Sequence, residues 1–196
     1  MPDWPSTVSS PTSSHLHHVP PPRGARLLVF LGGTLGNFPP GSRRRFLRQM
    51  AQVMTADDFL LIGTDLVKDP ATLCAAYNDS AGITAEFNRN LLHVVNRELD
   101  ADFDPASFDH IALFNTHHEW IEMRLRARTP QFVTIRALGL RVRFKAGEEM
   151  RTEISAKFTR PRLENDLRAA GLEIVEWLTD DAKQFAVSLS QRSDCP

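Results

Sequence analysis

The chain has 196 residues, of which 42% are hydrophobic, and its 23 basic and 24 acidic residues give a net charge of -1. This balance provides no basic field for binding nucleic acid or an anionic membrane, and no apolar run approaches the roughly 20 residues that span a bilayer. The sequence therefore predicts a soluble, cytoplasmic α/β protein that acts on small molecules, and its two cysteines, Cys74 and Cys195, fit a reducing compartment.

The first segment, residues 1–25, is rich in proline and serine and holds few aliphatic side chains, so we predict a disordered lead-in. His15, His17 and His18 could hold a metal ion in principle. Because neither cysteine nor acidic partners accompany them, solvated histidines are the simpler interpretation.

An unbroken apolar run from Leu27 to Leu31 follows, which is typical of a strand that is buried on both faces of a parallel sheet. It ends in a loop with three glycines, Gly32, Gly33 and Gly36, and with Asn37. Ligands bind at the carboxyl ends of strands in open α/β sheets, so this loop is a candidate site. On the glycines alone, a plain turn between strand and helix is the better interpretation, because no complete phosphate-binding motif is present.

Helical spacing of apolar residues after Ser42 predicts a helix, and Phe59 to Ile62 predicts the next strand. Strand, loop, helix and strand together indicate a right-handed crossover between two parallel strands. The arginines of this helix are expected on its solvent face; they are Arg43, Arg44, Arg45 and Arg48.

Two further helices are predicted, one beginning near Pro70 and one from Thr84 to Leu99. Tyr77, the only tyrosine, lies between them. Its hydroxyl can donate and accept a hydrogen bond, so a ligand contact and a satisfied core tyrosine are equally good interpretations.

From His110 to Phe144 the sequence alternates in a way that predicts an antiparallel lobe with one apolar face and one wet, charged face, the latter including Glu122, Arg124 and Arg126. Met123 lies on the apolar face, where core packing is commoner than ligand contact. Farther on, Glu153 and Ser155 are two residues apart and would point to the same side of an extended segment. A carboxylate and a hydroxyl can hold both nitrogens of an imidazole, but pattern alone slightly favours a solvent-facing polar segment.

The chain closes with a predicted helix from Arg162 to Ala170 and a hairpin of two strands at the edge of the sheet. We therefore predict a Rossmann-like sheet domain made of residues 26–76 and 159–196, interrupted by a mixed α/β lobe at residues 77–158.

Several motifs, in this order, resemble the L-histidine Nα-methyltransferase family of ergothioneine biosynthesis. They are Leu31–Asn37, Phe59–Lys68, Tyr77–Asp79, Phe87–Leu92, Glu122–Met123 and Gly147–Phe158. The resemblance extends from about His15 to Leu189. It implies a class I fold, S-adenosylmethionine as methyl donor, and conversion of L-histidine to Nα-trimethylhistidine (hercynine).

The resemblance also implies roles for single residues. Asn37 and Tyr77 would hold the α-amino and carboxylate groups of the substrate, Glu153 and Ser155 would bind its imidazole, and Met123 would line the imidazole pocket. Gly32 would lie beside the amino-acid portion of the cofactor.

Family members carry a long region ahead of the Arg26 strand that is not found in this sequence, which suggests a truncated gene or a displaced start. We therefore expect an incomplete class I sheet, weak binding of S-adenosylmethionine by this chain alone, and exposed edges on the Leu27 and Phe59 strands. A complete protein is expected to be monomeric, and this chain could associate through the exposed edge. The alternative to an active enzyme is an inactive fragment or a non-catalytic module that binds amino acids or a partner.

Overall fold

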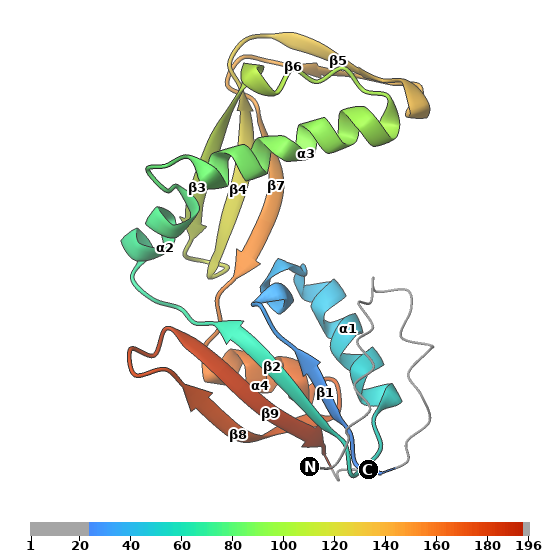
Figure 1. Cartoon of the computed structure of the whole chain (residues 1–196), viewed down its shortest axis with the longest axis vertical. Coiled ribbons are helices and arrows are strands. Elements are labelled where there is room, and N and C mark those ends of the chain that lie inside the picture. The colour runs from blue at the N-terminus through green and yellow to red at the C-terminus, as the bar shows by residue number, and fades with distance from the viewer. Residues whose placement is uncertain (1–23, 194–196) are drawn as a thin grey trace, which may run out of the picture.

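The computed structural model describes residues 24–193, which form a sheet domain and an elongated lobe (Figure 1). The predicted lead-in lies outside the described residues except for its last two positions, 24 and 25. Its three histidines and Cys195 lie outside them as well.

The sheet domain contains four strands in the order β1-β2-β9-β8. Its first part comprises β1 (Leu27–Phe30), a 3-10 helix η2 (Thr34–Asn37), α1 (Pro40–Val53) and β2 (Phe59–Asp65). Its last part comprises α4 (Arg160–Arg168), β8 (Leu172–Thr179) and β9 (Phe185–Arg192). Strands β1 and β2 are parallel, and β9 is antiparallel to both β2 and β8. The predicted crossover and the closing hairpin are therefore confirmed.

The lobe is built around a three-stranded antiparallel sheet, β3-β4-β7, with the two-stranded hairpin β5-β6 at its far end (Figure 1). Its helices are α2 (Pro70–Tyr77), α3 (Ile83–Leu99), η3 (Pro105–Ser107) and η4 (Arg136–Leu138). Its strands are β3 (Phe108–Asn115), β4 (Trp120–Ala127), β5 (Gln131–Ile135), β6 (Leu140–Phe144) and β7 (Glu149–Ala156). The predicted antiparallel lobe is confirmed.

Two crossings that lie side by side connect the lobe to the sheet domain. Phe158 donates its backbone N–H to the Asp65 carbonyl at 2.8 Å, and Val67 donates to the Phe158 carbonyl at 3.0 Å. The chain therefore leaves and re-enters the sheet domain at neighbouring, hydrogen-bonded residues.

The burial of the first two strands differs from the expectation. Leu27 and Val29 are 56% and 53% exposed, because α1 covers only one face of β1 and no described residue covers the other. Strand β1 is an edge strand, as expected, but β2 is not, since β9 pairs with its other side.

Two charged residues predicted on wet surfaces are buried. Arg43 in α1 donates from Nε to Asp166 of α4 at 2.7 Å, which ties the two helices together. Glu122 in β4 accepts a hydrogen bond from the Trp120 indole at 2.8 Å and pairs with Arg124. In both cases a charged partner compensates for the loss of water. None of the helices within residues 24–193 is long and apolar enough to cross a membrane.

Candidate functional site

Four of the predicted binding residues lie on one covered face of the lobe sheet. Strand β7 directs Glu153 and Ser155 to the same side, and the neighbouring β4 pairs Met123 with Glu153 and Ile121 with Ser155. Helix α2 covers this face, because its Leu73 packs with Ile121 and Met123 in one apolar cluster. Tyr77, the last residue of α2, packs against the same cluster.

Tyr77 and Ser155 are in direct contact. The Tyr77 hydroxyl donates to Ser155 Oγ at 2.8 Å, although the two residues are 78 positions apart in sequence. Ser155 is only 6% exposed, so its segment is not the solvent-facing one that pattern alone slightly favoured.

Lys157 continues the alternation of Glu153 and Ser155 and is completely buried. Its ammonium lies 2.7 Å from Asp65 Oδ2 and 3.0 Å from both the Tyr77 hydroxyl and Ser155 Oγ. Sequence reasoning gave no role to Lys157 or Asp65. The signal for Lys157 was its spacing of two from Ser155, whereas Asp65 could only be found from the fold.

Glu153 lies beside this cluster and is neither fully buried nor fully exposed. Burial raises the pKa of its carboxyl, and the positive charge of Lys157 opposes part of that rise. The Glu153 carboxylate has no hydrogen-bond partner among residues 24–193, so its oxygens are available to a ligand donor.

A second series of hydrogen bonds holds the end of α2 in place. His110 Nε2 donates to the Tyr77 carbonyl at 2.9 Å, because a carbonyl oxygen can only accept. The other ring nitrogen of His110 therefore accepts from Asn88 Nδ2, also at 2.9 Å. The Tyr77 backbone is thus anchored to α3 and β3 while its hydroxyl reaches β7.

Asn37 and Gly32 approach the site from the sheet domain. A Cβ built on Gly36 would lie 2.6 Å from the Ala156 carbonyl oxygen, so η2 packs directly against β7 beside Ser155. Asn37 is exposed at the end of η2, and its side chain has no hydrogen-bond partner within the described part of the chain. Gly32 is also exposed, with a φ of +80°. The contact of Gly36 with Ala156 brings Asn37 close to the lobe site, whereas Gly32 lies in the loop after β1.

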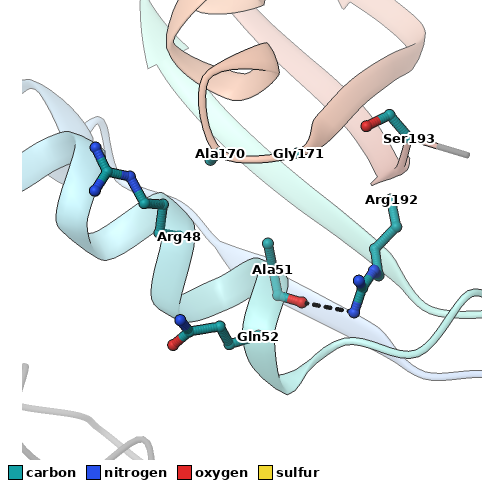
Figure 2. A pocket seen from close by; sticks show the side chains of 7 residues that line it. All are labelled: Arg48, Ala51, Gln52, Ala170, Gly171, Arg192 and Ser193. Atoms are coloured by element: carbon teal, nitrogen blue, oxygen red, sulfur yellow. Dashed lines mark hydrogen bonds between the residues drawn. The ribbon is translucent and has the colours of Figure 1, made fainter. Parts of the chain in front are cut away.

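The hollow in Figure 2 is separate from this cluster. It lies between the end of α1 and the turn before β8, at the end of the sheet where β2 begins, and Arg48, Gly171 and Arg192 line it. Arg192 is already occupied there, since it donates to the Ala51 and Met54 carbonyls. None of the predicted site residues contributes to this hollow. No cluster of potential metal ligands occurs within residues 24–193.

The comparisons with known proteins agree in one assignment. The family model described as "Histidine-specific methyltransferase, SAM-dependent" matches residues 7–192. Histidine N-alpha-methyltransferase from Mycobacterium tuberculosis is 50% identical over 187 residues, which cover 95% of this chain and 58% of that protein. The protein of the same name from Mycolicibacterium smegmatis is 52% identical over 178 residues, covering 91% of this chain and 55% of that protein.

The chain thus spans about half the length of the curated relatives it matches. A solved S-adenosylmethionine-dependent methyltransferase from Clostridium acetobutylicum shows 7% identity and a TM-score of 0.44, over 91% of this chain and 62% of that one. The assignment does not depend on that weak likeness. Since the family model extends over nearly the whole sequence, the chain belongs to the histidine-specific, S-adenosylmethionine-dependent methyltransferase family.

Proposed function

We propose that this protein methylates the α-amino group of L-histidine in three steps, giving Nα-trimethylhistidine (hercynine) in ergothioneine biosynthesis. The observation that carries the proposal is the shared face of β7, β4 and α2, where a carboxylate, a hydroxyl and a phenol surround an apolar floor. The name histidine N-alpha-methyltransferase of the mycobacterial relative supports this substrate. The ergothioneine biosynthesis protein 1 of Neurospora crassa, 39% identical over 71 residues that cover 36% of this chain and 8% of that protein, supports the pathway.

The imidazole of histidine suits the lobe site. Glu153 offers acceptor oxygens and Ser155 a hydroxyl on one side of β7, and the Met123 side chain supplies an apolar wall next to them. A site built in this way leaves buried polar groups unpaired with any amino acid that lacks the ring nitrogens. The penalty is about 1 to 3 kcal/mol for each group.

The substrate's amino end would face the sheet domain. Tyr77 and Asn37 would orient the α-amino and carboxylate groups from opposite sides, because η2 packs against β7 next to Ser155. The α-amino group of a free amino acid is mostly protonated near pH 7, so the site must hold the amine in its neutral form before the lone pair can attack the methyl group. Positioning of its lone pair then carries most of the rate.

S-adenosylmethionine, when bound, supplies an electrophilic methyl group from its sulfonium. The loop after β1 fits its amino-acid portion, since Gly32 and Gly33 are both in the left-handed region, at φ +80° and +68°, and have no side chain to block a ligand. Gly32 would lie beside that portion of the cofactor.

The test is mass spectrometry of L-histidine incubated with the purified chain and S-adenosylmethionine, with circular dichroism to show that the chain is folded. The proposal predicts successive additions of one, two and three methyl groups, at high concentrations of S-adenosylmethionine because this chain alone is expected to bind it weakly. A folded chain that binds histidine but leaves it unmethylated would support an amino-acid-binding module instead. A folded chain with no affinity for histidine would overturn the proposal.

A further inference from the structure

The buried ammonium of Lys157 determines the direction of the hydrogen bonds around it. A lysine ammonium has three donors and no acceptor, and here three oxygens lie within 3.0 Å of Nζ: Asp65 Oδ2, the Tyr77 hydroxyl and Ser155 Oγ. Each partner must therefore accept from Lys157. The ammonium also lies 4.7 Å from the centre of the Tyr77 ring, which favours the positive charge.

The hydrogen bond between the two hydroxyls then fixes the remaining protons. With the substrate bound as proposed, Lys157 and the α-amino N–H take the two lone pairs of the Tyr77 oxygen, so Tyr77 can only donate to Ser155, at 2.8 Å. Ser155 Oγ then accepts from both Tyr77 and Lys157 and has no lone pair left. The hydroxyl proton of Ser155 has no acceptor among residues 24–193. It is the one donor that this network presents to a ligand.

Glu153 complements this donor. It lies on the same side of β7 as Ser155, and as a carboxylate it can only accept. The pair thus offers one donor and one acceptor, which matches a ring with one lone-pair nitrogen and one N–H. A neutral imidazole has this arrangement, whereas a pyrrole has no lone-pair nitrogen.

We propose that Lys157 is a positioning residue for substrate selection: by occupying one lone pair on Tyr77 and one on Ser155, it makes Ser155 an obligate donor to the ring of the bound substrate. This inference rests on the proposed function and names the ring chemistry that the site selects. Without Lys157, Ser155 can turn its proton to Tyr77 and accept from an N–H of the ligand.

The experiment measures a preference between ligands by calorimetry on the full chain. The ligands are L-histidine, 2-pyrrolylalanine and 3-pyrrolylalanine, whose N–H groups stand where one or the other histidine nitrogen would be. For the wild-type chain we expect histidine to bind about ten- to a hundredfold more tightly than either analogue. In Lys157→Met this preference is expected to fall at least about fivefold.

The matched control is Lys68→Met. Lys68 contacts the same Asp65, at 2.7 Å from Oδ1, but neither hydroxyl, so the preference should stay unchanged. Lys68 also keeps Asp65 paired when Lys157 is replaced. If Lys157→Met alone does not fold, the double variant Asp65→Asn/Lys157→Met removes the carboxylate at position 65 as well. It is expected to show the same fall in the preference for histidine.

A double-mutant cycle separates positioning from general damage. In a Ser155→Ala background, Lys157→Met should change the preference no further, since its effect passes through Ser155. An equal loss of affinity for all three ligands, or an unchanged preference in Lys157→Met, would overturn this inference and leave the proposed function standing. A wild-type chain that does not bind histidine at all would overturn both.

Discussion

Asn37 occupies a position where a side chain contributes little to folding. It is exposed at the end of η2, and its side chain has no hydrogen-bond partner within the described residues. Replacing an asparagine in such a place should hardly change the free energy of unfolding, so an effect on methylation would report on function alone.

We expect Asn37→Ala to abolish methylation of histidine while changing the free energy of unfolding by less than about 0.5 kcal/mol. The reason is that the α-amino lone pair loses its orientation, whereas no packed contact is lost. Mass spectrometry of the product and urea unfolding measure the two effects. A fully active variant would remove Asn37 from the site.

Glu153 is the residue proposed to give histidine its advantage over other amino acids. Glu153→Ala should weaken the binding of histidine about tenfold or more, and that of alanine or leucine hardly at all, because only the imidazole N–H loses its acceptor. Calorimetric titration with each amino acid provides the comparison. Equal losses for all of them would show that Glu153 supports the fold rather than the ring.

The same carboxyl makes stability depend on pH. Burial raises the pKa of Glu153 above its ordinary value of 4.5, so the folded chain binds this proton more tightly than the unfolded chain does. The stabilisation that the protonated Glu153 contributes to the folded state is fully present below pH 4.5. It is lost as the pH rises through the higher folded-state pKa. Glu153→Gln, which stays neutral, should therefore gain more stability relative to wild type at pH 7 than at pH 4. Urea unfolding at both pH values tests this, and a gain that is larger at pH 4 would give the opposite sign.

At the scale of elements, the contact between η2 and β7 joins the two halves of the proposed site. Gly36 makes this contact possible, because any Cβ there would lie 2.6 Å from the Ala156 carbonyl oxygen and 3.1 Å from its nitrogen. Both are backbone atoms of β7, which cannot move aside as a flexible side chain can.

Gly36→Ala is accordingly expected to destabilise the fold by about 1 to 3 kcal/mol and to reduce histidine binding, since η2 must shift away from Ser155. Gly41→Ala is the matched control: it lies in α1 with nothing within 4 Å of a new Cβ, and should be neutral or slightly stabilising. Chemical unfolding and calorimetry follow both properties. A Gly36→Ala chain as stable as the control would show that the two elements do not pack tightly.

Much of the element order could be predicted from sequence, because apolar periodicity reports local structure directly. The run at Leu27 predicted a strand correctly but its burial wrongly, since an apolar run does not reveal whether a covering layer is present. For Glu122, alternation predicted a wet face, and the partners that allow its burial, Trp120 and Arg124, could not be inferred from spacing.

The site was predictable only in part. That Glu153 and Ser155 point to the same side follows from their spacing of two on one strand. The roles of Lys157 and Asp65 depend on a contact between residues 92 positions apart, for which the sequence carries no local signal. The roles of all six predicted site residues came from the family resemblance and stay predictions; these residues are Gly32, Asn37, Tyr77, Met123, Glu153 and Ser155.

At the scale of the whole molecule, β1 has an apolar face that no described residue covers, next to an edge with no partner strand among residues 24–193. Leu27, Val29 and Leu31 are each at least 50% exposed, and β1 has no second neighbouring strand among residues 24–193. An apolar edge of this kind favours pairing with another chain.

We expect the chain to self-associate at micromolar concentration and Val29→Lys to reduce that association, because a charge would have to be buried in the contact. Leu138→Lys, which replaces a side chain that is 61% exposed in the lobe, is the control and should leave association unchanged. Sedimentation velocity at several concentrations measures both. A purely monomeric wild-type chain, or equal effects of the two variants, would contradict the expectation.

Because the two crossings between the sheet domain and the lobe are neighbours, the lobe could be exchanged for another one as a unit. Leu66 and Phe158 form a bridge pair, so the two cut points for grafting lie next to each other and a short linker could join them. A lobe with a different pocket could be inserted there without altering the strand order β1-β2-β9-β8. Replacing the lobe at these two points, with Lys68 retained, is therefore expected to change the pocket while Lys68 keeps Asp65 paired in the sheet domain.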